Sequence, residues 1–100
     1  QAYVGTQSLG VGQTWQNVTG SRALSTTYYN TTNRSIQVIT NATVVSANTF
    51  STLTVNGVAI PGSSGYTTNA NSMVSAIIPP GNSYILGGSS SVLITWSELR

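Results

Sequence analysis

Apolar and polar residues alternate along several short stretches of the chain, which is the pattern of half-buried β-strands. The clearest stretch is residues 91–99, SVLITWSEL, where Val92, Ile94 and Trp96 point one way and Leu93, Thr95 and Ser97 point the other. We therefore expect the first three side chains to lie in a hydrophobic core. Helical spacing of apolar residues is hard to find anywhere in the sequence.

A β-hairpin is predicted for residues 51–60, STLTVNGVAI. Leu53 and Val55 share one face of its first strand, and the strand leads directly into Asn56-Gly57. Asn and Gly both accept the positive φ angles of a type I′ turn, so this dipeptide between apolar runs is a strong hairpin signal.

Three further segments carry strand patterns. In residues 35–47, SIQVITNATVVSA, Ile36 and Val38 share one face, and a β-bulge is expected near Asn41. Residues 72–86, SMVSAIIPPGNSYIL, predict two strands separated by a real interruption at the Pro-Pro-Gly corner, because proline cannot donate to a β-ladder.

Residues 22–38, RALSTTYYNTTNRSIQV, read as a hairpin whose turn runs from Asn30 to Asn33. Tyr28 and Tyr29 are adjacent on its first strand, so one ring should face the core and the other should face outward.

Together these segments predict an all-β fold, a small antiparallel β-sandwich of seven or eight strands. Residues 61–71 and 87–90 are rich in Gly, Ser and Asn and are expected to be loops. We expect residues 1–12, which contain three glycines, to be an extended lead-in from an upstream segment, and residues 13–100 to form the sandwich domain.

Composition narrows the possible functions. Only 4% of the residues are charged, as three arginines and one glutamate, and His, Cys and Lys are absent. A chain of this kind has no basic face for nucleic acid, no apolar run long enough for membrane insertion, and none of the usual zinc or triad residues. Glycoside hydrolysis ordinarily needs two carboxylates, and Glu98 is the only carboxylate side chain. We therefore expect no catalytic residues, no metal site and no cofactor.

The function class that remains is ligand binding through aromatic rings, amides and hydroxyls. The candidate ligand-binding residues are Trp15, Tyr28, Arg34, Tyr66 and Tyr84. Each has a structural alternative: Trp15 could pack over the sandwich edge, and the tyrosines could anchor loops or the core. The candidate subunit contacts are Arg22, Glu98 and Arg100.

The two arginines of residues 22–38 have two interpretations. They could lay their aliphatic stems over apolar surface and cap carbonyls, or offer a donor fork to an acidic sugar, a phosphate or a neighbouring subunit's carboxylate. We expect Arg22 to pair with Glu98 or a C-terminal carboxylate, in the same chain or across a subunit boundary. Arg34 follows the predicted turn and is expected to point into water.

Four segments carry a family resemblance: GVGQTWQNVTGSRALSTTYYNTTNRSIQVIT, LTVNGV, IPPGNSY and the terminal WSELR. They resemble the C-terminal receptor-binding domain of bacteriophage tail fibre proteins, over residues 9–100. The resemblance implies a β-sandwich at the tip of a homotrimeric fibre on the virion, outside the cell. Its implied partner is a bacterial surface polysaccharide or an outer-membrane component. The alternative is a structural module that closes the trimer or decorates the virion without binding a host receptor.

Overall fold

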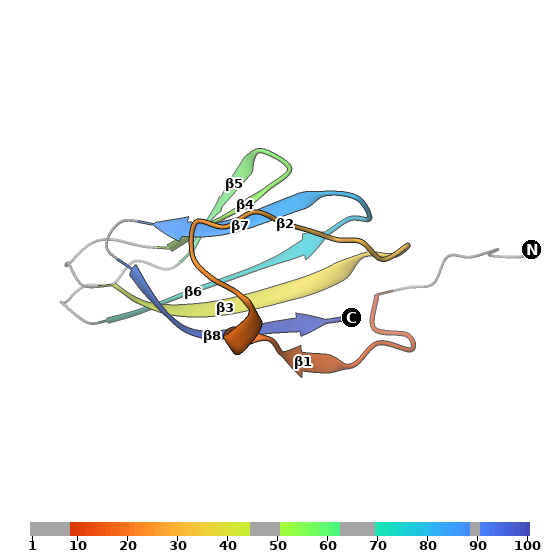
Figure 1. Ribbon diagram of the computed structural model, residues 1–100, viewed down its shortest axis with the longest axis horizontal. Coiled ribbons are helices and arrows are strands. Elements are labelled where there is room, and N and C mark those ends of the chain that lie inside the picture. The colour runs from red at the N-terminus through yellow and green to blue at the C-terminus, as the bar shows by residue number, and fades with distance from the viewer. Residues whose placement is uncertain (1–8, 45–50, 63–69, 89–90) are drawn as a thin grey trace, which may run out of the picture.

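The protein is a β-sandwich of two four-stranded antiparallel sheets (Figure 1). A computed structural model describes residues 9–44, 51–62, 70–88 and 91–100, and these form eight strands and one short 3-10 helix, η1 (Thr19–Ser21). The predicted fold class is confirmed. No helix in this described part of the chain is long and apolar enough to cross a membrane.

The first sheet, which we call the long-strand sheet, has the order β1-β8-β3-β6. Its strands are β1 (Trp15–Asn17), β8 (Ser91–Leu99), β3 (Ile36–Val44) and β6 (Ala70–Ile78). The second, the short-strand sheet, has the order β2-β7-β4-β5. Its strands are β2 (Tyr28–Tyr29), β7 (Ser83–Gly88), β4 (Ser51–Val55) and β5 (Val58–Pro61).

The core lies between the two sheets and is filled by the inward residues of the central strands. The alternation in β3 and β4 is as predicted, because Ile36, Val38 and Leu53 are wholly buried and Val55 is nearly so. The core cluster comprises Ile36, Val38, Leu53, Val55, Val74, Ala76, Ile78, Tyr84, Leu86 and Trp96. The hairpin prediction is also confirmed: β4 pairs with β5 through a turn in which Asn56 and Gly57 have φ angles of 50° and 85°.

A bulge in β8 reverses part of its predicted alternation. Asn41 of β3 pairs with Thr95 and the next residue pairs with Leu93, so Ile94 has no partner in this ladder. The irregularity near Asn41 was predicted, but the extra residue belongs to β8. The prediction that Val92 and Ile94 share the core face with Trp96 is therefore wrong: they are 57% and 40% exposed, and Leu93 packs against the core instead.

The hairpin predicted for residues 22–38 is also wrong. Its two halves lie in different sheets, because β2 pairs with β7 while β3 pairs with β6 and β8. The buried side chain of Asn30 holds the crossing: its amide donates to the carbonyls of Arg34 (2.8 Å) and Ile78 (2.9 Å), and its oxygen accepts from the backbone N–H (3.0 Å) and hydroxyl (2.6 Å) of Thr32. The Pro-Pro-Gly corner likewise carries the chain from β6 to β7 between the sheets.

Some loop boundaries differ from the sequence-based expectation. Pro61 belongs to β5, residues 70–71 belong to β6 and residues 87–88 belong to β7, while the rest of the predicted loops beyond Gly62 lies outside the described residues. Of the expected lead-in, residues 9–12 are described, and they form turns rather than an extended segment.

Candidate binding surface and the Glu98 cluster

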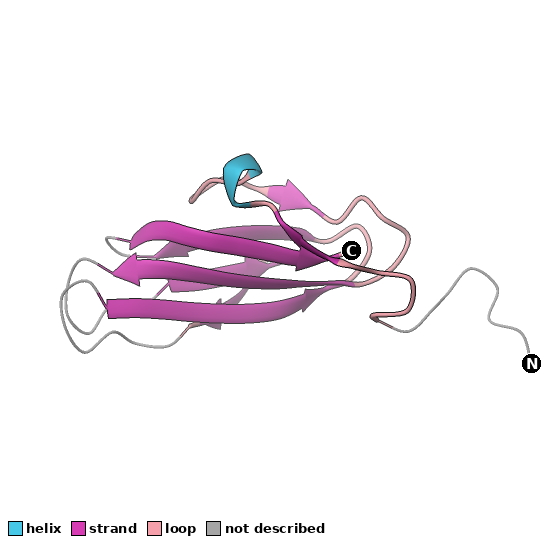
Figure 2. Cartoon of the chain, turned by 90° about the horizontal axis from the view of Figure 1, so that it is seen from below, coloured by secondary structure: helices cyan, strands magenta, loops and turns pink. Residues whose placement is uncertain are grey.

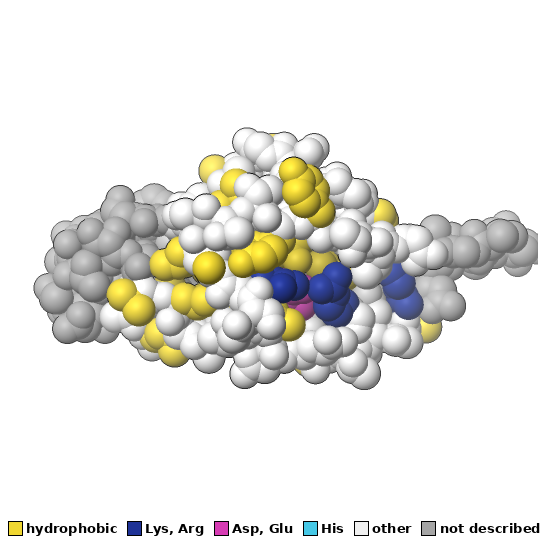
Figure 3. All heavy atoms as spheres, in the orientation of Figure 1, with side chains coloured by type: hydrophobic (Ala, Val, Ile, Leu, Met, Phe, Trp, Pro, Cys, Tyr) yellow, Lys and Arg dark blue, Asp and Glu magenta, His cyan; other side chains and the backbone are white. Residues whose placement is uncertain are grey.

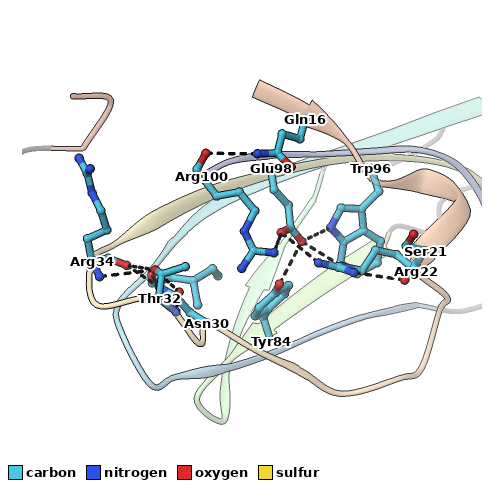
Figure 4. A network of polar contacts seen from close by, with 11 residues as sticks. Gln16, Ser21, Arg22, Asn30, Thr32, Arg34, Tyr84, Trp96, Glu98 and Arg100 are labelled. Atoms are coloured by element: carbon cyan, nitrogen blue, oxygen red, sulfur yellow. Dashed lines mark hydrogen bonds and ion pairs between the residues drawn. The ribbon is translucent and has the colours of Figure 1, made fainter. Parts of the chain in front are cut away.

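The only carboxylate side chain of the protein is fully buried at one edge of the sandwich (Figure 4). It belongs to Glu98, two residues after Trp96 on the inward face of β8. Its Oε1 accepts from Arg22 Nη2 (3.2 Å) and Arg100 Nη1 (3.1 Å). Its Oε2 accepts from Arg22 Nε, the Tyr84 hydroxyl and the Trp96 indole N–H, each at 3.0 Å. We call these five residues the Glu98 cluster.

Arg22 reaches this carboxylate from the segment that crosses between the sheets after η1. It binds both oxygens at once, which is the strong, geometrically fixed form of an arginine–carboxylate pair. Its guanidinium also lies over the ring of Tyr28, 4.7 Å from the centroid, and donates to the Ser21 carbonyl. The Tyr28 hydroxyl accepts from the backbone N–H of Ala23, so ring and arginine are fixed together.

Burial and the neighbouring Glu98 carboxylate shift two pKa values in the cluster. Burial alone would lower the pKa of Arg22, but hydrogen bonds to Glu98 and its negative charge offset this and raise the pKa above its ordinary value. The pKa of Tyr84 is also raised, first by burial and then by the charge and hydrogen bond of Glu98. Both groups are therefore held in the forms that donate to the carboxylate.

The raised pKa of Tyr84 predicts a loss of stability in alkali. An unfolded tyrosine ionises near pH 10, whereas the folded one resists ionisation, so stability that is complete below about pH 10 falls as the pH rises above it. We expect the free energy of unfolding of the wild type to fall more steeply between about pH 9 and pH 11 than that of Tyr84→Phe. Urea denaturation across this range measures both slopes. Parallel curves for the two proteins would contradict the prediction.

The three residues predicted as subunit contacts form one cluster within the chain. Glu98 is 0% exposed, and its acceptor sites are occupied by donors of its own chain. The expected pairing of Arg22 with Glu98 is confirmed within the chain. Arg100 pairs with the same carboxylate.

Two of the predicted ligand-binding residues, Tyr28 and Tyr84, lie together as register partners on β2 and β7, with ring centroids 6.0 Å apart. Tyr84 is wholly buried in the core and offers no surface to a ligand, whereas Tyr28 is partly buried, with its ring edge-on to Trp96. Tyr29 is the outward ring of the Tyr28–Tyr29 pair, at 60% exposure. Arg34 donates to the Val11 carbonyl and is partly buried, so it does not simply point into water. Tyr66 lies outside the described residues.

Trp15 remains an exposed aromatic candidate, half-exposed on β1 at the rim of the long-strand sheet. It shares a surface that we call the outer face, the side of this sheet turned away from the core. Figure 2 looks onto this sheet. Strand register places four rows on the outer face: Trp15-Leu99-Gln37-Ile77, Asn17-Ser97-Ile39-Ser75, Thr95-Asn41-Met73 and Val92-Thr43-Asn71.

The outer face mixes apolar side chains with amides and hydroxyls and carries no charge. A shallow hollow of about 260 Å³ lies on it, lined by Ile39, Met73, Val74 and Ser75. Ile39, Met73 and Ser75 were not identified as surface candidates from the sequence. The sequence did contain an indication of this surface. Met73 and Ile77 give β6 a second apolar face, although the other face of the strand already fills the core.

Comparison of the chain with protein-family models, with curated proteins and with solved structures found no match.

Proposed function

We propose that this domain is a non-enzymatic attachment domain that binds a cell-surface glycan on the outer face, with Trp15 as the stacking ring. The observation that carries the proposal is the composition of that face: a half-exposed indole in line with an amide, among further amides and hydroxyls, without charge.

This composition matches the chemistry of a sugar. Pyranose rings present apolar C–H faces, which pack on an indole, and hydroxyl edges, which need both donors and acceptors. Gln37 lies two strands from Trp15 in the same row, which corresponds to about 10 Å at normal strand spacing. The row therefore has room for more than one sugar ring.

The state of the single carboxylate supports binding rather than catalysis. Glu98 is buried and holds five hydrogen bonds from its own chain, so it is not placed to meet a ligand as an acid, a base or a nucleophile.

The family resemblance supports a location for this activity. In this proposal the domain is the tip of a homotrimeric bacteriophage tail fibre on the virion. Its partner is a bacterial surface polysaccharide or another outer-membrane component.

Trp15→Ala tests the proposal. Loss of a central aromatic contact typically costs about 2 kcal/mol or more, so we expect about 30-fold weaker binding of the chain to polysaccharide extracted from host cells, with an unchanged thermal midpoint. The matched control is Tyr29→Ala, which removes an aromatic ring exposed on the other sheet and should bind like the wild type. Equal affinity of the Trp15→Ala variant and the wild type would exclude the outer face as the glycan site.

A purely structural function is the second candidate, and the exposed apolar residues of the outer face favour it. Met73, Ile77 and Val92 are 55%, 45% and 57% exposed, and two other copies of the chain could cover them in a trimer. In that case light scattering would show that Met73→Lys dissociates the trimer, and fibres lacking the domain would still adsorb to host cells. Under the proposed function, Met73→Lys leaves the oligomeric mass unchanged and deletion of the domain abolishes adsorption.

A further inference from the structure

The Glu98 cluster holds more positive charge than its carboxylate can neutralise. Two guanidiniums, those of Arg22 and Arg100, share the single carboxylate of Glu98, so one positive charge remains. The chain has no second acidic side chain that could balance it. Because five donors already surround the carboxylate, it has no spare lone pair for further pairing.

Donors in this cluster are left available at the surface. The guanidinium of Arg100 has five N–H groups, and within the described part of the chain its only hydrogen bond is the one from Nη1 to Glu98. The side chains of Arg22 and Arg100 are 14% and 21% exposed. Figure 3 shows arginine side chains gathered on one face of the molecule around the acidic side chain.

Arg22 and Glu98 are each held by several contacts. Arg22 donates to both carboxylate oxygens of Glu98 and lies over the ring of Tyr28. Glu98 also accepts hydrogen bonds from the Tyr84 hydroxyl and the Trp96 indole. Donors fixed in this way lose little conformational entropy when a ligand binds. This arrangement is therefore suited to recognising an anion at the sandwich edge.

We infer that Arg100 and Arg22 form a subsite for an anionic group of the bound glycan, a sugar carboxylate or a phosphate substituent. The inference rests on the proposed function and makes it more specific, because it identifies the ligand as an acidic polysaccharide. The subsite adjoins the outer face: Thr14 and Arg100 exchange backbone hydrogen bonds of 3.2 and 3.1 Å, and the next pair along the ladder is Trp15 with Leu99. The Arg100 guanidinium lies on the inward side with Glu98 and the indole lies on the outer face, so a glycan that wraps around the edge strand β1 meets the two in succession.

The test is an NMR titration of the ¹⁵N-labelled chain that follows the arginine Nε–H and tryptophan Nε1–H signals. The probes are glucuronate, glucose 6-phosphate and glucose. We expect glucuronate, glucose 6-phosphate or both to shift the Arg22 and Arg100 signals, and glucose to leave them unchanged. Comparison of the two anions shows whether the subsite prefers a carboxylate or a phosphate. No shift with either anion, or an equal shift with glucose, would overturn the inference.

Arg100→Gln should weaken anion binding about 10-fold, the value of one charge-assisted hydrogen bond, and Arg100→Lys should fall between this variant and the wild type. Arg34→Gln removes the same formal charge elsewhere and should bind like the wild type. Wild-type affinity in Arg100→Gln, or an equal loss in Arg34→Gln, would overturn the subsite. Failure of the proposed function is visible separately, as host polysaccharide binding that is insensitive to Trp15→Ala.

Discussion

Replacing Glu98 by alanine is expected to lower the free energy of unfolding by about 3 to 5 kcal/mol, the cost of removing one partner from a buried ion pair. The change leaves the guanidiniums of Arg22 and Arg100 facing each other and removes the acceptor of the Tyr84 hydroxyl and the Trp96 indole. A loss of this size is a large part of the stability of a typical small domain. Urea denaturation followed by tryptophan fluorescence measures it.

Glu98→Gln is the matched control for size and shape. It keeps one acceptor oxygen but turns an amide N–H₂ toward groups that are themselves donors, so we expect a stability between those of wild type and Glu98→Ala. If both variants unfolded within about 0.5 kcal/mol of the wild type, the usual range for a surface change, the cluster would not stabilise the fold.

Arg22→Ala is expected to cost about 2 to 4 kcal/mol, less than Glu98→Ala because Arg100 still pairs with the carboxylate. The variant loses two hydrogen bonds to Glu98 of the long-strand sheet and the contact with the Tyr28 ring of the short-strand sheet, so the crossover segment loses contacts with both sheets. Thermal and urea unfolding measure the loss.

The comparison for this variant is Arg34→Ala, which removes the same side-chain type from outside the cluster. Arg34 is partly buried and donates to the Val11 carbonyl, so its replacement should cost about 1 kcal/mol, the value of one hydrogen bond. Identical thermal midpoints for wild type and Arg22→Ala would show that the buried pair contributes nothing.

The strands and the tight turn could be predicted from the sequence because they depend on neighbouring residues. Alternation over four or five positions fixed the inward faces of Ile36 and Val38 in β3 and of Leu53 and Val55 in β4. Asn56-Gly57 needs only its own positive φ angles to specify the β4–β5 turn.

Sheet membership could not be predicted in the same way. The pattern around Asn30 is equally compatible with a hairpin and with a crossing between sheets. What decides it is the bond from the Asn30 amide to the carbonyl of Ile78, 48 residues away. The bulge at Ile94 also could not be predicted from the sequence. The apolar alternation continues through it, but the one extra residue moves Val92 to the outer face of the sheet.

The Glu98 cluster was predictable in part. Scarcity of charge pointed to the pairing of Arg22 with Glu98, because the chain offers no other carboxylate side chain. Its burial was missed, although Glu98 lies two residues from Trp96 and two-residue alternation places both on the inward face of β8. The hydrogen bond from the Tyr84 hydroxyl to Glu98 could not be predicted. Tyr84 lies on β7 of the opposite sheet, and no pattern in the neighbouring residues indicates this pairing.

The most direct test of glycan attachment is an array of bacterial surface oligosaccharides, neutral and acidic, probed with the wild-type chain, Trp15→Ala and Arg100→Gln. We predict that the wild type binds a defined set of glycans, that Trp15→Ala loses the whole set, and that Arg100→Gln loses the preference for acidic members. Wild-type binding to no glycan on an array that includes the host's own polysaccharide, or full retention of binding by Trp15→Ala, would contradict this account.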